Sequence, residues 1–162
     1  MKILGVDPGL NATGYGLVET GKDCLTLIEA GIIRTKPRVP LEKRLSELYK
    51  GLDEVVQEFS PDVFSVEELY SHYKHPKTAV IMGHARGALL VVAGNAEIPV
   101  FSYSATMIKK SLTGAGHATK EQVASMIART FNCGEMNVQA DVTDALAAAL
   151  CHINHENYGG VF

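Results

Sequence analysis

Hydrophobic and polar positions follow two different periods along the chain, and these periods predict the order of the elements. Short apolar runs over residues 2–7, 14–20 and 25–35 predict three strands, and the tetrapeptide TGKD predicts a tight turn between the last two. Leucine and valine then recur at helical spacing over residues 41–59, with charged residues between them. The tripeptide SPD that follows ends this predicted helix.

The second half of the chain alternates strands with helices. Residues 63–67 and the segment PVFSY predict two strands, separated by a long apolar helix from Pro76 to about residue 96. Three further helices are predicted over residues 104–112, 119–131 and 140–155. Short connections favour hairpins among the first three strands, and alternation with helices favours parallel neighbours later. We therefore predict one α/β domain over residues 1–162, a mixed five-stranded sheet with helices on both faces.

Carboxylates stand where buried strands should be apolar. The run ILGVD ends in Asp7, and VFSVEE ends in Glu67 and Glu68. Both strand ends fall at the edge where α/β sheets bind ligands. The segment QADVTDALAAAL places Asp141 and Asp144 three residues apart, on one side of a helix near its start. Its small alanines predict that this helix approaches the sheet closely.

Each acid taken alone has a structural explanation, as a turn former, a solvent-facing strand end or a helix cap. Together, four converging carboxylates without a His or Cys companion favour a hard cation, Mg²⁺ or Mn²⁺. Such sites often hold two ions that clamp a phosphodiester displacement. The alternation of side chains along the strand does not choose between Glu67 and Glu68.

Gly14 and Gly16 leave room beside the second strand, which we expect the nucleic-acid backbone to use.

The charge of the chain is unevenly distributed. The net charge is −3, but residues 1–70 carry −4, residues 71–130 carry +5 and residues 131–162 carry −4. The segment LYSHYKHP, residues 69–76, lies where the basic block begins, and in it Tyr70 and Tyr73 alternate with Lys74 and two histidines. Rings for base stacking beside cations for phosphates suit unpaired or distorted nucleic acid, although an ordinary surface loop is the simpler explanation.

With these residues assembled, the chain resembles the RuvC family of Holliday-junction resolvases, which have the ribonuclease H-like fold. The resemblance rests on GVDPGLNATGYG, VEELY, GHARG, GAGHATK and QADVTDALAAAL. It implies a Mg²⁺-dependent endonuclease that resolves four-way DNA junctions in recombination and repair, with four catalytic, metal-binding acids: Asp7, Glu67, Asp141 and Asp144. Among the two glutamates it favours Glu67, because the family's acid is followed by any residue, an apolar one and an aromatic one.

The resemblance also implies partners and DNA contacts. The family aromatic that contacts DNA matches Tyr70, and two family lysines match Lys109 and Lys120, with Lys110 and Arg86 as weaker candidates. It further implies a homodimer and a branch-migration motor of the RuvA and RuvB type. The apolar helix 76–97, hydrophobic on more than one face, agrees with a second copy as partner.

Other readings stay open at this stage. A ribonuclease H-like nuclease that trims structured ribosomal RNA would use similar chemistry, and a non-catalytic nucleic-acid binder would lack the intact acids. An actin-like kinase needs two lobes and a second Asp-Gly motif, which the chain does not have. The absence of a signal-peptide pattern, of a membrane-length apolar run and of paired cysteines predicts a cytoplasmic protein with reduced thiols.

Overall fold

The computed structural model describes residues 1–22, 24–69, 76–131 and 139–157. The elements in these residues confirm the predicted types and their order. They are β1 (Lys2–Asp7), β2 (Ala12–Thr20), β3 (Leu25–Arg34), α1 (Leu41–Phe59), β4 (Val63–Glu67), α2 (Pro76–Asn95), β5 (Val100–Tyr103), α3 (Ala105–Thr113), α4 (Lys120–Thr130) and α5 (Ala140–Asn157). The main difference is that β2 begins two residues before its predicted start, because Ala12 and Thr13 still pair with β3.

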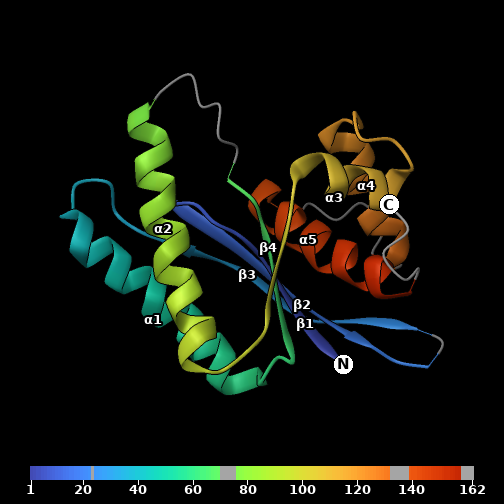
Figure 1. The fold of residues 1–162 in the computed structure, drawn as a ribbon, viewed down its shortest axis with the longest axis horizontal. Helices are drawn as coiled ribbons and strands as arrows, with labels where there is room; N and C mark the ends of the chain where they lie inside the picture. The colour runs from blue at the N-terminus through green and yellow to red at the C-terminus, as the bar shows by residue number, and fades with distance from the viewer. Residues whose placement is uncertain (23, 70–75, 132–138, 158–162) are drawn as a thin grey trace.

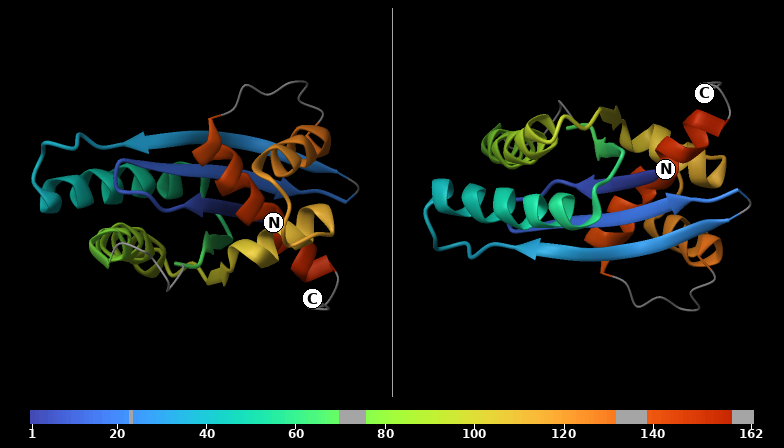
Figure 2. Two further views of the ribbon diagram at one scale, coloured as in Figure 1. Left: turned by 90° about the horizontal axis from the view of Figure 1, so that it is seen from above. Right: turned by 90° about the horizontal axis from the view of Figure 1, so that it is seen from below.

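The strands form one mixed sheet in the order β3-β2-β1-β4-β5. The pairs β1–β2 and β2–β3 are antiparallel, and the pairs β1–β4 and β4–β5 are parallel. Helix α5 crosses one face of the sheet, whereas α1 and α2 pack together on the other (Figures 1 and 2). The predicted mixed five-stranded sheet with helices on both faces is therefore confirmed.

The period of two along β1 divides its side chains between two cores. Ile3 belongs to the core with α3, α4 and α5, while Leu4 and Val6 belong to the core with α1 and α2. All three side chains are fully buried. Since both faces are covered, β1 is the rigid centre of the fold, and its last residue is Asp7.

Glycines on β1 and β2 let α5 lie directly on the sheet. A Cβ at Gly5 would lie 2.0 Å from the Ala145 carbonyl oxygen, and one at Gly14 would lie 2.0 Å from that of Asp141. A Cβ at Gly16 would lie 2.4 Å from the Leu146 side chain. The expectation that Gly14 and Gly16 leave space for nucleic acid is therefore wrong, because α5 fills that space. The predicted close approach of the alanine-rich helix is confirmed.

The helix ends follow their sequence signals. Ser60 ends α1 in the left-handed conformation, and Ser104 caps α3 by accepting a hydrogen bond from the Met107 N–H. Thr119 and Gln122 form the predicted capping box at the start of α4. This cap fixes the direction in which α4 starts, and Lys120 is its first residue.

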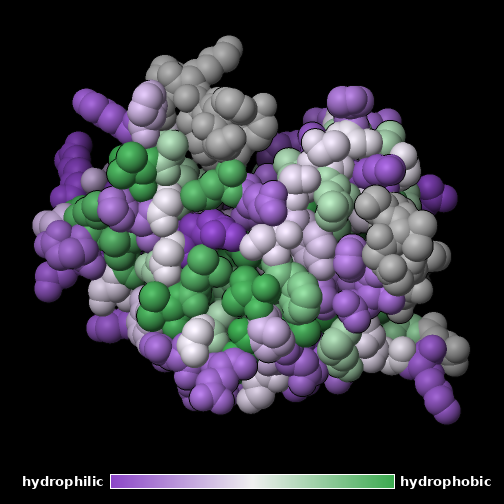
Figure 3. Space-filling model, in the orientation of Figure 1, coloured by the Kyte–Doolittle hydropathy of each residue, from purple (hydrophilic) through white to green (hydrophobic). Residues whose placement is uncertain are grey.

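The surface of α2 carries apolar side chains that the described chain does not cover. Val80, Ile81 and Val91 are exposed on this helix, and Val100 and Phe101 are exposed on the edge strand β5. In Figure 3 the hydrophobic surface gathers over the lower part of α2 and beside it.

Among the residues that the structure describes, no helix is both long and apolar enough to cross a lipid bilayer.

Candidate active site

The ends of two parallel strands bring the first two acids together. Val6 on β1 pairs with Val66 on β4, and the next residue on each strand is an acid, Asp7 and Glu67. Both acids are half-buried, whereas Glu68 is exposed and its backbone N–H donates to the Tyr103 carbonyl. The geometry therefore brings Glu67, rather than Glu68, beside Asp7.

Helix α5 brings the other two acids to the same edge. Gly14 pairs with Asp7 across β1 and β2, and the Asp141 backbone lies against Gly14. Asp144 follows three residues later on α5, which puts it on the same side of the helix. The convergence of three separate elements at the carboxyl ends of β1 and β4 agrees with the sequence prediction.

The carboxylates perturb one another. The pKa of Asp7 is raised to about 7, first by burial and then by the charges of Asp144, Glu67 and Asp141, against the opposing effect of Lys120. Burial also raises the pKa of Glu67, with Asp144 adding to the increase and Lys120 and Lys109 opposing it. Ionising all the acids together is costly without cations nearby, so the site favours positive charge.

A lysine supplies part of that charge. The Lys120 Nζ lies 2.7 Å from the Asp144 Oδ2, with the lysine side chain 69% exposed and the aspartate 27% exposed. The pairing with Asp144 raises the pKa of Lys120, which stays protonated. Glu67, Lys109, Lys120 and Asp144 share a cavity of about 160 Å³ between β4, α3, α4 and α5. The two lysines predicted as DNA contacts therefore line the acidic site.

The donor set fits a hard divalent cation. Its four carboxylates offer only oxygen ligands, which suits Mg²⁺ or Mn²⁺ better than zinc or copper. Within the described residues, no three His, Cys, Asp or Glu side chains are already arranged as ligands of one ion, and Asp144 pairs with Lys120. A divalent cation fits the site because it would neutralise Asp7 and Glu67, whose pKa values are raised.

Of the other predicted DNA contacts, two lie within the described residues and three lie outside them. Arg86 on α2 donates from Nη2 to the Ser102 Oγ at 2.8 Å and from Nε to the Glu67 carbonyl at 3.4 Å, so it ties β5 and α2 to the end of β4. Lys110 lies on α3 next to Lys109. Tyr70, Tyr73 and Lys74 lie outside the described residues.

The sequence interpretation missed the residues that hold the loop after Asp7. Thr13, fully buried, donates to the Gly9 carbonyl at 2.7 Å and closes this loop. Arg44 on α1, 8% exposed, donates to the Leu10 carbonyl and to the Asn11 Oδ1 at 3.1 and 2.6 Å. The only sequence signal for Arg44 is its position in a short basic stretch within an otherwise acidic block.

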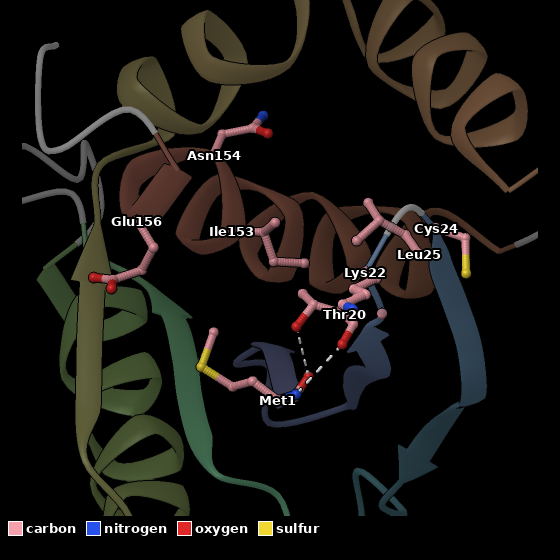
Figure 4. A pocket seen from close by; sticks show the side chains of 9 residues that line it. Met1, Thr20, Lys22, Cys24, Leu25, Ile153, Asn154 and Glu156 are labelled. Carbon is pink, nitrogen blue, oxygen red and sulfur yellow. Dashed lines mark hydrogen bonds between the residues drawn. The ribbon is translucent and has the colours of Figure 1, made fainter.

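A second hollow lies at the other end of the sheet, near the turn between β2 and β3. Met1, Lys22, Cys24, Ile153 and Glu156 are among its lining residues (Figure 4). Met1 and Thr20 close one side of it through the contact between the Thr20 N–H and the Met1 carbonyl. The acids at the ends of β1 and β4 take no part in this hollow.

Comparison with known proteins shows which family this chain belongs to. The model of crossover junction endodeoxyribonuclease RuvC matches residues 3–152, which include all four acids. The chain belongs to the RuvC family. It is 42% identical over 149 residues to the RuvC of Rhodopirellula baltica, covering 92% of this chain and 84% of that protein. It is 40% identical to the RuvC of Desulforamulus reducens over 161 residues, covering 99% and 98% of the two chains.

Solved RuvC structures share the fold. The structure titled T. thermophilus RuvC in complex with Holliday junction substrate superposes with a TM-score of 0.92 at 34% identity, covering 99% of this chain and 97% of that one. The yeast mitochondrial Holliday junction resolvase superposes with a TM-score of 0.69 at 14% identity, covering 96% and 78% of the chains, and supports the fold alone. The predicted RuvC membership and ribonuclease H-like fold are confirmed.

Replacing Lys120 with methionine is expected to shift the pH dependence of cleavage. Lys120 lowers the pKa of Asp7, so its removal raises that pKa above about 7. The acid limb of the pH–rate profile at subsaturating Mg²⁺ should move to higher pH, with a larger loss of rate at pH 7 than at pH 9.

The matched control for this prediction is Lys109→Met. Lys109 lowers the pKa of Glu67 but is absent from the groups that act on Asp7, so its variant should move the limb less. Equal shifts for the two variants would contradict the special position of Lys120.

Proposed function

We propose that this chain, as one nuclease domain over residues 1–162, is a metal-dependent endonuclease that resolves four-way DNA junctions. The observation that carries the proposal is the convergence of Asp7, Glu67, Asp141 and Asp144 from β1, β4 and α5 in a member of the RuvC family. A Thermus thermophilus relative with the same fold has been solved with Holliday junction substrate. The alternative of an RNA-trimming nuclease has no observation of its own in its favour.

The four acids would hold Mg²⁺, with two ions per site and Mn²⁺ as the alternative metal. When bound, the ions would lower the pKa of an attacking water and stabilise charge on the leaving 3′ oxygen of a phosphodiester. The side chains supply the rest of the chemistry. Asp7 sits on the most rigid strand, and its raised pKa makes it the acid that gains most from a cation. Lys120, beside Asp144, is positioned to neutralise a phosphate oxygen in the same cavity.

Some of the DNA contacts proposed for this site lie beside the acids. Lys109 and Lys120 line the same cavity as Glu67 and Asp144. Lys110 and Arg86 lie nearby on α3 and α2, and the remaining proposed contacts are Tyr70, Tyr73 and Lys74. The cations would hold phosphates and the two rings would stack on unpaired bases of a distorted backbone, while the acids hold the metal.

A homodimer would match the two-fold symmetry of a four-way junction. The exposed apolar side chains of α2, Val80, Ile81 and Val91, support a second copy as the group that covers this helix. Two sites facing opposed strands would then cut both within one complex. We further propose that the dimer works with a branch-migration motor of the RuvA and RuvB type in the cytoplasm.

Cleavage of defined substrates tests the function directly. A synthetic four-way junction, a linear duplex of the same sequence and a structured RNA are each incubated with the protein, with and without Mg²⁺. We expect paired nicks on opposed strands of the junction, only with Mg²⁺, at a rate at least about 100-fold above that on the duplex. Faster cleavage of the RNA would replace the proposal by the RNA-trimming alternative, and binding without cleavage of any substrate would contradict a nuclease.

A further inference from the structure

The first part of the chain has a net negative charge but contains one basic segment. Residues 34–44, RTKPRVPLEKR, hold five of the eight Lys and Arg side chains of residues 1–70 but only one of their twelve acids. The segment joins β3 to α1. Arg34, Lys36, Arg38 and Lys43 are exposed, and hydrophilic side chains cover the left edge of the molecule over this loop in Figure 3.

A buried arginine makes this segment rigid. Arg44 donates from Nε to the Thr35 Oγ1 at 2.8 Å and from Nη2 to the loop that follows Asp7. Thr35 itself donates to that loop, from Oγ1 to the Leu10 carbonyl at 2.5 Å and from its N–H to the Asn11 carbonyl at 3.1 Å. We call the surface made by residues 9–11 and 34–38 the ledge. Its two loops are joined by these bonds into one unit.

The charge of the ledge is not neutralised within the described part of the chain. The partners of Arg44 there are a hydroxyl, a carbonyl and an amide oxygen, all of them neutral. Lys36 and Arg38 have no ion pair with any residue that the structure describes. The acceptor oxygen of the Asn11 amide is committed to Arg44, which leaves its NH₂ group as a donor. The ledge therefore presents cations and a donor to an anionic partner.

The ledge lies beside the acidic site. Asp7 pairs with Gly14 and Gly14 with Ile32, two residues before Arg34. Two strand spacings across and two residues along put the Cα of Arg34 roughly 12 Å from that of Asp7. The Arg34 Nη2 bonds to the Gln139 Oε1, two residues before Asp141. Figures 1 and 2 show the β3–α1 loop and the β1–β2 loop at the same end of the sheet.

We propose that the ledge binds the sugar-phosphate backbone of the nucleic-acid substrate a few nucleotides from the cleaved bond. The acids at the centre repel phosphates, and Lys109 and Lys120, which line a cavity with Glu67 and Asp144, offer cations on the side of α3 and α4. Lys36, Arg38 and the Asn11 amide supply the contacts on the other side. Arg44 acts as a positioning residue, since it holds both loops of the ledge in place. This inference rests on the proposed function, because it concerns the same substrate.

The test is a charge-neutral double variant, Lys36→Gln with Arg38→Gln. Its affinity for a four-way junction is measured by fluorescence anisotropy without Mg²⁺, over a series of salt concentrations. We expect a dissociation constant about 10-fold higher at 0.1 M salt, and a slope of log affinity against log salt that is smaller by about 2, because two phosphate contacts are lost.

The control double variant is Lys22→Gln with Arg129→Gln, which removes the same two charges elsewhere. Lys22 lies next to the Thr20–Leu25 pair, at the end of β2 and β3 opposite to the Ala12–Arg34 pair beside the ledge, and Arg129 lies in the last turn of α4, away from Lys120. We expect less than about a 2-fold change and an unaltered slope for this control. Equal losses of junction affinity in the two double variants would overturn the proposal, because they would show that only the total charge of the protein matters.

Neutral methylphosphonates in the junction locate the contact. Placed singly at each of the first few phosphates from the cleavage site, they should weaken binding of the wild type at one or two positions and have no further effect on the ledge variant. Additive losses at every position would overturn the proposal. Wild-type junction cleavage in Mg²⁺ is measured alongside, so that failure of the ledge and failure of the nuclease function give different results.

Discussion

Replacing Asp7 with asparagine is expected to lower junction cleavage by about 1,000-fold or more, equivalent to roughly 4 kcal/mol of transition-state stabilisation. Asp7 lies at the centre of the site, where Glu67, Asp141 and Asp144 all act on its pKa. The amide keeps the size of the side chain but loses the charge that holds a metal. Junction binding, measured without Mg²⁺, should remain within a few-fold of the wild type or become tighter, because one negative charge near the phosphates is gone.

The same variant should be more stable than the wild type in the absence of metal. Folding raises the pKa of Asp7 from 3.8 to about 7, so the folded protein binds this proton more tightly than the unfolded chain does. The free energy of unfolding therefore falls as the pH rises from about 4 to 7, and the full cost of the charge is present above that range. At pH 8 we expect the variant to melt at least about 2 °C higher, with the difference vanishing below pH 4.

Mg²⁺ should reverse this order. Binding to the folded state raises the melting temperature of the wild type, and the asparagine variant should respond much less. The control is Glu68→Gln, one residue from Glu67 but exposed, which should cleave and respond to Mg²⁺ as the wild type does. An unimpaired cleavage rate in the Asp7 variant would remove Asp7 from the catalytic site, and an inactive Glu68 variant would reopen the choice between the two glutamates.

The second large effect is expected for Gly14→Ala. The added Cβ would lie 2.0 Å from the Asp141 carbonyl oxygen and 3.0 Å from the Val142 nitrogen, both of them backbone atoms of α5. Because backbone cannot turn aside as a side chain can, α5 must shift away from the sheet, and Asp141 and Asp144 shift with it. We expect a loss of about 3 kcal/mol or more in stability, a drop in melting temperature of about 10 °C, and a fall in cleavage of about 100-fold or more.

Gly87→Ala is the matched control for this prediction. Gly87 lies within α2, and apart from its neighbours along the helix, no atom of the described chain lies within 4 Å of the Cβ that would be added there. Alanine favours a helix interior over glycine, so this variant should be more stable by about 0.5–1 kcal/mol, in contrast to the loss expected for Gly14→Ala. Gly14→Ala variants that fold, melt and cleave like the wild type would show that α5 does not sit against β2 as described.

Much of the fold could be predicted because the local signals agree with the final structure. The amphipathic pattern of α1, the capping box of Thr119 and Gln122, and the proline at the start of α2 act over one or two helical turns. The sequence pattern predicts the start of β2 two residues too late, because Ala12 and Thr13 belong to the strand only through their pairing with β3, which a single strand does not reveal. The same limit explains the glycines, whose role depends on a helix more than 120 residues further along the chain.

By itself, the sequence determined that acids end two buried strands and begin an alanine-rich helix, because burial and periodicity act on neighbours along the chain. It also determined the RuvC resemblance, since that depends on short motifs. Only the tertiary structure decided that Glu67 rather than Glu68 faces Asp7, that Lys120 pairs with Asp144, and that Arg44 joins the loop after Asp7 to the β3–α1 loop. The contacts of Lys120 with Asp144, of Arg44 with the loop after Asp7, and of Asp7 with Glu67 join residues 24 to 60 positions apart. The packing of α1, α4 and α5 around the sheet fixes them.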